Sequence, residues 1–330
     1  MANADHTPTV TLLVIAWRMR ATIGDALRSA LAQTYPCEVI VSDDSSGDGT
    51  LDAAREVLSG YPNAANVQLR STTRNLGLCA HLNELAHLAR GEILVCLSGD
   101  DVAYPQRVQR LAEAFMRHPQ AQLIGSAVDD IDAKGNAIAR RVRGLPECVD
   151  QRWFLRRGKL VTVLGASMAF RRKLLTSLPP LQGTVEDNML SLRAALLGEC
   201  RCLQEPLLAY RLHGGNLNAW MFDRSGHDYA AYERRHRRVI AMYRDIAADQ
   251  RRCVAARDDL PRERKDLGLQ LAAMYELEAE MRESILDRPR SQWLSPLWRG
   301  LRHPGLRRKS AERTLKLLLP RRWFGRSIKA

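Results

Sequence analysis

The chain has 330 residues, of which 45% are hydrophobic and 26% are charged. This length allows about two domains, and the composition suits a chain that folds around a hydrophobic core, which excludes disordered, collagen-like and disulfide-rich miniprotein classes. The longest apolar runs, residues 10–17 and 93–97, are too short for a membrane-spanning helix. Residues 1–8 lack the basic and apolar blocks of a secretory signal. We therefore expect a cytoplasmic protein whose seven scattered cysteines are reduced.

The formal charge of +13 is concentrated at one end of the chain. Residues 288–330 hold 13 Lys or Arg and one acid, Glu312, and they also hold Trp293, Trp298 and Trp323. Basic residues interleaved with tryptophan and leucine are typical of segments that lie on anionic membranes. This pattern predicts that residues 288–330 form a basic amphipathic tail on an anionic membrane surface. A solvated tail and nucleic-acid binding are the alternatives, and nucleic acid is the least favoured.

Apolar strands alternate with amphipathic helices over the first 117 residues. The expected strands cover residues 9–17, 37–42, 67–71 and 92–97. The expected helices cover residues 22–34, 49–58, 78–89 and 105–117. Such alternation predicts an α/β fold with a doubly wound, mostly parallel sheet, similar to a Rossmann fold.

The remainder of the chain is less regular. Strands are expected at residues 122–128, 160–170 and 201–210, a helix at 187–197, and charged helices over 228–287. With boundaries near Trp220 and Asp287, the sequence predicts three parts. These are a domain of residues 1–220 with halves 1–117 and 118–220, a helical extension of residues 221–287, and the tail of residues 288–330.

Two acidic pairs follow expected strands. Asp43 and Asp44 end the second strand, and Asp100 and Asp101 come directly after the fourth. Ligands of open parallel sheets bind beyond the carboxyl ends of the strands. Carboxylates there can accept hydrogen bonds from a base or a ribose, or hold a hard divalent cation. The alternative is that Asp43 and Asp44 only cap the next helix.

Four short motifs in a fixed order carry a resemblance to a known family. They are QTYP at residues 33–36, DDSSGDGT at 43–50, RNLG at 74–77 and SGDD at 98–101. In this order and spacing, the sequence resembles a family 2 glycosyltransferase of GT-A fold over residues 8–216. Ser98 stands where many members of that family have the first acid of the last motif, and Ser45 stands where they have glycine.

The resemblance implies a role for each residue of the donor side. Asp43 or Asp44 would bind the nucleobase, Arg74 the nucleotide, and Asp100 the ribose or donor sugar. Asp101 would bind Mn²⁺ or Mg²⁺. Because Ser98 replaces an acid, the metal would rest mainly on Asp101.

The second half supplies the expected acceptor side. Residues 165–172 resemble the acceptor-side strand of the family, and Glu186 with Asp187 resembles its Glu-Asp motif, which implies that Asp187 is the catalytic base. Such a base must reach the acceptor hydroxyl. The alternative is that both acids only favour the positive end of a helix dipole. His213, in the run HGGN at 213–216, would ligate the metal or contact phosphate.

Together these features predict an inverting, metal-dependent glycosyltransferase. It would move a sugar from a nucleotide diphosphate-sugar to a hydroxyl of a glycan or lipid-linked acceptor, in cell-envelope polysaccharide biosynthesis at the inner face of the plasma membrane. One alternative is a sugar nucleotidylyltransferase, but residues 17–22 lack its glycine-rich basic loop. The other is a noncatalytic membrane or nucleic-acid adaptor with the GT-A fold.

Overall fold

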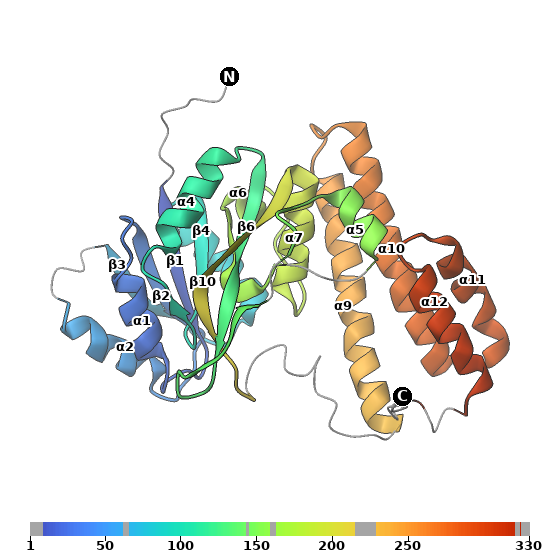
Figure 1. The fold of residues 1–330 in the computed structure, drawn as a ribbon, viewed down its shortest axis with the longest axis horizontal. Helices are drawn as coiled ribbons and strands as arrows, with labels where there is room; N and C mark the ends of the chain where they lie inside the picture. Colours follow the sequence, from blue (N-terminus) through green and yellow to red (C-terminus); the bar gives the residue numbers. More distant parts are fainter. Residues whose placement is uncertain are drawn as a thin grey trace. The chain divides into compact units, whose positions relative to one another are not determined.

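A computed structural model describes residues 9–61, 66–142, 145–158, 163–214, 229–320 and Phe324. The chain divides into two compact units (Figure 1). The first, here called the sheet unit, comprises residues 1–150 and 162–213, and the second, the helical unit, comprises residues 151–161 and 214–330. The boundary expected near Trp220 lies outside the described residues.

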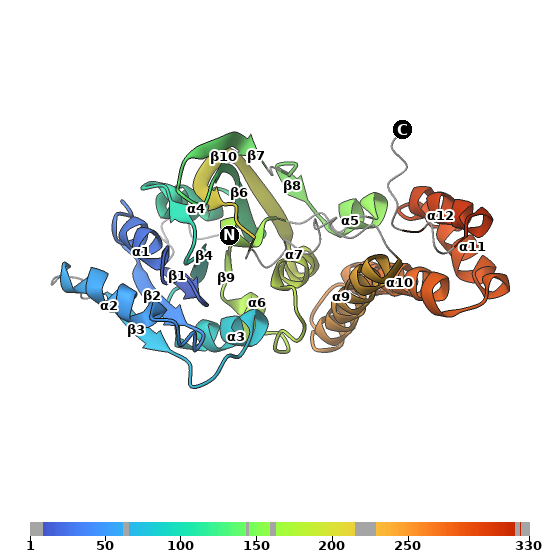
Figure 2. The same cartoon turned by 90° about the horizontal axis from the view of Figure 1, so that it is seen from below.

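One half of the sheet is parallel and follows the predicted order of elements. Its strands are β1 (Val10–Ala16), β2 (Glu38–Asp43), β3 (Val67–Ser71) and β4 (Ile93–Ser98), arranged β3-β2-β1-β4. The helices are α1 (Ile23–Leu31), α2 (Thr50–Ser59), α3 (Leu78–Leu88) and α4 (Arg107–Arg117). In Figure 2, α1 and α3 lie on opposite sides of β1 and β2. Both faces of the central strands are therefore covered, which is why β1 is a continuous apolar run.

The other half of the sheet is mixed. Its strands are β5 (Val102–Ala103), β6 (Ala121–Ile131), β7 (Ala137–Val142), β8 (Cys148–Val149), β9 (Ala169–Arg171) and β10 (Glu199–Arg211). β9 is antiparallel to both β4 and β6, and β6 is parallel to β10. The long β10 therefore reaches the same edge of the sheet as the end of β4.

The prediction of a strand at residues 160–170 is wrong for most of that range. Residues 159–162 lie outside the described residues, and Gly165–Ser167 form a 3₁₀ helix, η1, so that the strand is limited to β9. The Ser167 hydroxyl donates to the carbonyl of Leu164 at 3.0 Å, which closes this turn. Two helices follow, α6 (Lys173–Thr176) and α7 (Glu186–Leu197).

The helical unit is built on an antiparallel pair, α9 (Tyr229–Ala255) and α10 (Arg262–Asp287). Arg244 on α9 pairs with Glu283 on α10 at 2.7 Å, and the rings of Tyr243 and Tyr275 stack with centroids 5.9 Å apart. The other helices are α5 (Gln151–Arg157), η2 (Arg290–Gln292), α11 (Leu294–Arg302), α12 (Arg307–Thr314) and η3 (Leu315–Leu318). No helix of the described residues combines the length and the apolarity needed to cross a membrane.

Much of the basic segment 288–330 is folded into this unit. Trp293, which we expected at a membrane surface, is 0% exposed, and its indole Nε1 donates to the carbonyl of Arg288 at 2.9 Å. Trp323 lies outside the described residues. Arg313 on α12 donates two hydrogen bonds of 2.7 Å to Glu278, which is fully buried on α10. Burial raises the pKa of Glu278, but the hydrogen bonds and charge of Arg313 outweigh it and lower the value to about 2.

Candidate functional site

The two acidic segments lie on either side of the end of β1. The amide of Asp44 donates to the carbonyl of Ala16 at 2.8 Å, and the amide of Gly99 donates to the carbonyl of Ile15 at 2.8 Å. Because β2 and β4 are both parallel to β1, their carboxyl ends meet at one edge of the sheet. The topology thus brings Asp43 and Asp44 to the same edge as Asp100 and Asp101.

Asp43 organises the loops that follow β1 and β2. Its carboxylate accepts a 3.0 Å hydrogen bond from the Ser46 amide, a short one from the Ser46 hydroxyl and one of 3.2 Å from Ser71. The Ser46 hydroxyl in turn accepts from the amide of Arg18 at 2.7 Å. The first residue of α2 is bound by another acid, Asp48, which accepts from the amide of Thr50 at 3.0 Å. Capping of α2 is therefore not the role of Asp43.

Asp44 holds the loop before α3. Its Oδ1 accepts from the hydroxyl of Thr72 and the amide of Leu76, and its Oδ2 accepts from the amide of Gly77, each at 2.9 Å. The carboxylate is 4% exposed, so most of its hydrogen-bonding capacity serves the loop. Arg74 is exposed on this loop. Asp44 thus fixes the backbone that presents Arg74.

Ser45, which stands where many members of the resembled family have glycine, has a left-handed backbone conformation. Its φ is 54°, in the left-handed region that favours glycine. For a residue with a side chain this conformation costs about 1 kcal/mol. The loop after β2 therefore tolerates serine at the expense of some local strain.

Asp100, Asp101 and His213 are brought together by the ends of β4 and β10. Nε2 of His213 lies 2.8 Å from Oδ2 of Asp100. Oδ1 of Asp101 accepts from the amide of Arg211 at 2.8 Å, and the Arg211 guanidinium donates to the carbonyl of Asp100 at 2.7 Å. His213 therefore contacts Asp100, the neighbour of Asp101, to which the sequence assigned the metal. Arg211, which sequence reasoning missed, fixes both acids, and its position two residues before His213 is the signal that could have marked it.

The second oxygen of Asp101 has no hydrogen-bond partner among the described residues, although the side chain is 0% exposed. Burial, followed by the charge of Asp100, raises the pKa of Asp101 well above its usual range. Bound positive charge would relieve both penalties. Within the described residues, no group of three or more His, Cys, Asp or Glu side chains is positioned to hold a metal. Mg²⁺ is usually bound by one or two carboxylates together with substrate phosphates, so this sparse set fits a cation that arrives with a diphosphate.

Arg107 on α4 is a second residue that sequence reasoning missed. It is 0% exposed, and its Nη2 donates to the carbonyls of Cys96 on β4 and Ala166 in η1, at 2.6 and 2.8 Å. Its Nε and Nη1 have no partner among the described residues. Burial is the main cause that lowers the pKa of Arg107 to about 10, and Cys96 and Asp101 oppose it. Arg107 therefore ties η1 to β4 within electrostatic reach of Asp101.

Glu186 and Asp187 begin α7 beside η1. Oε1 of Glu186 lies so close to Gly165 that a Cβ there would be 2.5 Å away. Burial, and then the charge of Asp187, raises the pKa of Glu186 to about 8, and burial raises the pKa of Asp187 to about 6. The dipole of α7 would by itself lower the pKa of each acid, so burial is the larger effect at this position. The shifts instead are of the kind found at functional sites.

The acids at the start of α7 and the acids after β4 have neighbours in common. Glu186 acts electrostatically on the Cys96 thiol, and Arg107 acts on both Cys96 and Asp101. No hydrogen bond or ion pair of the described residues joins Glu186 or Asp187 directly to Asp100 or Asp101. The acids at the start of α7 therefore lie near the Asp101 side of the sheet edge without contacting it.

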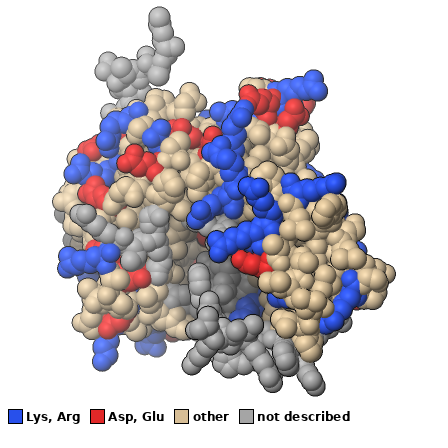
Figure 3. All heavy atoms as spheres, turned by 45° about the vertical axis from the view of Figure 1, so that its right-hand side comes forward, with Lys and Arg blue, Asp and Glu red and all other residues tan. Residues whose placement is uncertain are grey.

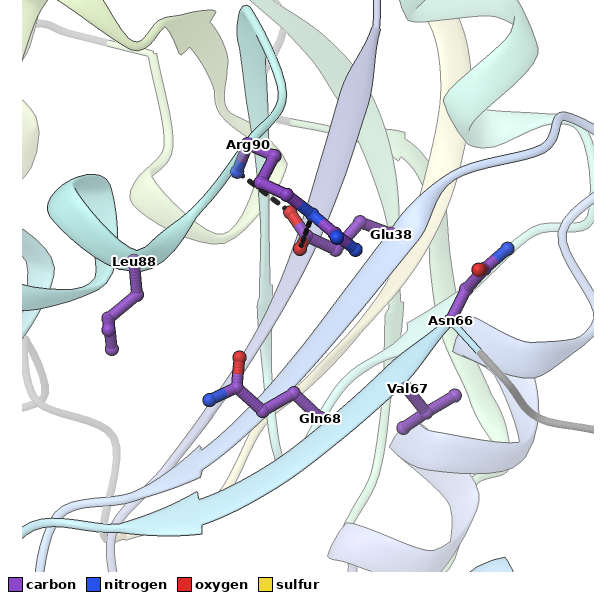
Figure 4. A pocket seen from close by; sticks show the side chains of 6 residues that line it. All are labelled: Glu38, Asn66, Val67, Gln68, Leu88 and Arg90. Carbon is purple, nitrogen blue, oxygen red and sulfur yellow. Dashed lines mark hydrogen bonds and ion pairs between the residues drawn. The ribbon is translucent and has the colours of Figure 1, made fainter.

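A hollow at the opposite edge of the sheet, near the amino ends of β2 and β3, is shown in Figure 4. It is lined by Glu38, Asn66, Val67, Gln68, Leu88 and Arg90. Glu38 begins β2 and pairs with Arg90 at 2.8 Å. Its carboxylate also accepts from Thr11 and from the amide of Arg90, so it is committed to the fold. The catalytic candidates are at the other edge.

Comparison with known proteins finds relatives named for glycosyltransfer or polysaccharide biosynthesis. The chain is 28% identical to the putative glycosyltransferase EpsE of Bacillus subtilis over 141 residues, 42% of this chain and 50% of EpsE. It is 34% identical to the succinoglycan biosynthesis protein ExoO of Rhizobium meliloti over 131 residues, 39% of this chain and 34% of ExoO. The chain thus spans half or less of the length of these relatives.

Among solved structures, TarS of S. aureus in complex with UDP-GlcNAc has a similar fold. Its TM-score is 0.58 at 18% identity, and the match covers 93% of this chain and 92% of TarS. The sheet and the helices beside it therefore form a GT-A arrangement. The family described as Glycosyl transferase family 2 matches residues 11–178, which include both acidic segments and η1. The chain belongs to glycosyl transferase family 2.

Proposed function

We propose that this protein is an inverting glycosyltransferase that moves a sugar from a nucleotide diphosphate-sugar to a hydroxyl group of a glycan or lipid-linked acceptor in polysaccharide biosynthesis. The observation that carries the proposal is the meeting of Asp100, Asp101 and His213 beside an unpaired, buried Asp101 oxygen. Such a cluster suits a cation with the diphosphate of a donor. Family membership and the relation to a succinoglycan biosynthesis protein support the polysaccharide assignment.

The donor would lie over the end of β1, between the two acidic segments. Arg74, held out by the loop that Asp44 organises, would meet the nucleotide. Asp43 is 5% exposed and already accepts from Ser46 and Ser71, so it would act on the base mainly by shaping the loop after β2. Asp100 would orient the ribose or the sugar.

Asp101, with its unpaired oxygen, and His213 would hold Mn²⁺ or Mg²⁺ together with the donor diphosphate. When bound, such a cation supplies Lewis-acid stabilisation of the negative charge on the leaving diphosphate. Arg211 holds this segment in place, because its amide donates to the Asp101 carboxylate and its guanidinium donates to the backbone carbonyl of Asp100. The chain's own contribution to a cation at this position is therefore the Asp101 carboxylate and the imidazole of His213.

Asp187 would act as the base. As the acceptor oxygen forms its bond to the anomeric carbon, the bond from that carbon to the diphosphate oxygen breaks and the diphosphate leaves with the electron pair. The acceptor proton passes to the Asp187 carboxylate. With a pKa raised to about 6, Asp187 is ionised at neutral pH and yet basic enough to take that proton. Attack from the face opposite the diphosphate inverts the anomeric configuration.

The test is a donor screen with the purified full-length chain. UDP- and GDP-sugars are incubated with Mn²⁺, with Mg²⁺ or with a chelator, and release of the nucleoside diphosphate is measured with and without glycan acceptors. We expect one donor to be turned over only with a cation. Binding of nucleoside diphosphates with no turnover of any donor would favour the noncatalytic adaptor. Formation of a sugar nucleotide from a sugar phosphate and a nucleoside triphosphate would favour the nucleotidylyltransferase.

A further inference from the structure

The helical unit exposes a group of large apolar side chains close together in the chain. Leu294 and Trp298 on α11 are 57% and 56% exposed, and Leu315 and Leu318 on η3 are 63% and 81% exposed. Elsewhere in the described part of this unit, Leu269 on α10 is the other exposed large apolar side chain, and at 46% it is less exposed than these four. We call the group of Leu294, Trp298, Leu315 and Leu318 the apolar patch.

The two patch residues on α11, Leu294 and Trp298, form a second apolar face of this helix, because its first apolar face is already buried. Pro296, Leu297 and Gly300 face the interior, where a Cβ on Gly300 would meet Ser310 of α12 and Met281 of α10 at 2.2 and 2.6 Å. Leu294 and Trp298 are four residues apart and therefore share the other face. No described segment of the chain covers that face, since both side chains remain more than half exposed.

The two elements of the patch are joined by a side chain. Arg290, in η2 just before α11, donates to the carbonyl of Leu319, the residue that follows η3. This hydrogen bond links the segment before α11 to the residue after η3. Leu315 and Leu318 are three residues apart, so they point to the same side of the 3₁₀ helix.

Basic side chains accompany the patch. Arg299 and Arg308 are 52% and 88% exposed, and Arg307 is also exposed. The guanidinium of Arg302 lies 4.9 Å from the centre of the Trp298 ring, so that a cation and an aromatic ring share one surface. Lys and Arg side chains stand at several places on the surface drawn in Figure 3. Glu312 is the one acid among residues 288–330.

We propose that α11 and η3 form a docking surface for an anionic lipid bilayer. Leucine and tryptophan gain free energy by entering the interfacial region of a bilayer, while each arginine near an anionic surface contributes about 1 kcal/mol. A nucleic acid would satisfy the arginines but would leave Leu294, Leu315 and Leu318 in water. The exposed leucines therefore favour the bilayer as the occupant.

The proposal can be tested by sedimentation of the full-length chain with vesicles. Vesicles of phosphatidylcholine alone are compared with vesicles that also contain phosphatidylglycerol. We expect binding to the anionic vesicles, and a weakening of about tenfold when Trp298→Ser and Leu318→Ser are combined. Leu269→Ser, on an exposed site of α10, is the apolar control and is expected to bind like the wild type.

A second pair of variants separates charge from apolar contact. Arg308 and Arg262 both pair with an acid four residues later, at 3.3 and 3.8 Å, and are 88% and 95% exposed. Arg308→Gln is expected to weaken vesicle binding about fivefold, and Arg262→Gln to leave it unchanged. Equal binding by the patch variants and the wild type would overturn the proposal. So would binding of DNA or RNA with no binding of vesicles. Circular dichroism of each variant verifies that the unit is folded.

Discussion

Nε2 of His213 lies 2.8 Å from Oδ2 of Asp100, although 113 positions separate the two residues in the chain. The contact joins the end of β10 to the segment after β4, and it places an imidazole against a carboxylate that is 6% exposed. A histidine in such a pair fixes the orientation of the acid as well as offering its own nitrogen. Replacing it tests whether the pair serves ligand binding or only joins two strands.

His213→Ala is expected to weaken binding of a nucleoside diphosphate in the presence of Mn²⁺ by about 10- to 100-fold, because both a ligand and the support of Asp100 are lost. Titration calorimetry measures the effect. His87→Ala, at an exposed site on α3, is the control. If His213→Ala bound the nucleotide and the metal as well as the wild type does, the residue would have only a structural role.

Asp187→Asn is expected to lower kcat by about 10²- to 10⁴-fold and to leave donor binding unchanged, because an amide cannot accept the proton. In the wild type the rate should rise with pH through about 6, where Asp187 loses its own proton. Steady-state rates from pH 5 to 9 measure both. Turnover by Asp187→Asn at the wild-type rate would remove the base assignment.

Glu186→Gln is expected to stabilise the protein at high pH only. The folded pKa of Glu186 is raised to about 8, so the folded chain holds this proton more tightly than the unfolded chain does. Stability is therefore lost as pH rises from the unfolded value of about 4.3 towards 8, and remains low above it. The glutamine variant avoids this loss. At high pH its free energy of unfolding should therefore exceed that of the wild type by on the order of 1–2 kcal/mol, after allowance for partial exposure of the side chain.

Urea unfolding at pH 5 and pH 9 measures this difference. At pH 5 the wild type and Glu186→Gln should have similar free energies of unfolding, because Glu186 is protonated in the folded state. A variant that is equally stabilised at both values would show that the cause is packing and not ionisation.

Arg107→Met is expected to destabilise the sheet unit by about 2–4 kcal/mol. The carbonyls of Cys96 and Ala166 would lose their donor while still buried, although a buried cation would also be removed. Arg110→Met, whose side chain is 48% exposed three positions along the same helix, should change stability by less than about 0.5 kcal/mol. Unfolding midpoints in urea compare the two. A neutral Arg107→Met would mean that the guanidinium does not hold η1 to β4.

The parallel half of the fold could be predicted because each strand is a continuous apolar run followed by an amphipathic helix. The bounds of β9 could not be predicted. The apolar residues around Val163 and Leu164 have no periodicity that distinguishes a strand from the 3₁₀ turn closed by Ser167. The acidic segments could be assigned to one edge from strand order alone. Arg107 could not be identified, because a charged residue is expected to be exposed and its partners are backbone carbonyls.

The basic end of the chain illustrates the same limit. Its composition does not distinguish Trp293, which is buried, from Trp298, which is 56% exposed. The difference depends on packing against helices that are distant in sequence. Arg313 likewise adds to the positive charge counted for this segment, yet in the folded chain it is buried and paired with Glu278.

That pairing decides how the end of the chain can be studied. A protein cut before Arg288 would lose Arg313 and Lys309 together, and Glu278 would keep the 3.3 Å pair with Arg282 on α10 but lose the two 2.7 Å hydrogen bonds from Arg313. Loss of one partner of a buried pair costs about 3–5 kcal/mol. Truncation would therefore destabilise the helices that it was meant to spare, whereas single substitutions at the exposed side chains of α11 and η3 leave the contacts of Glu278 intact.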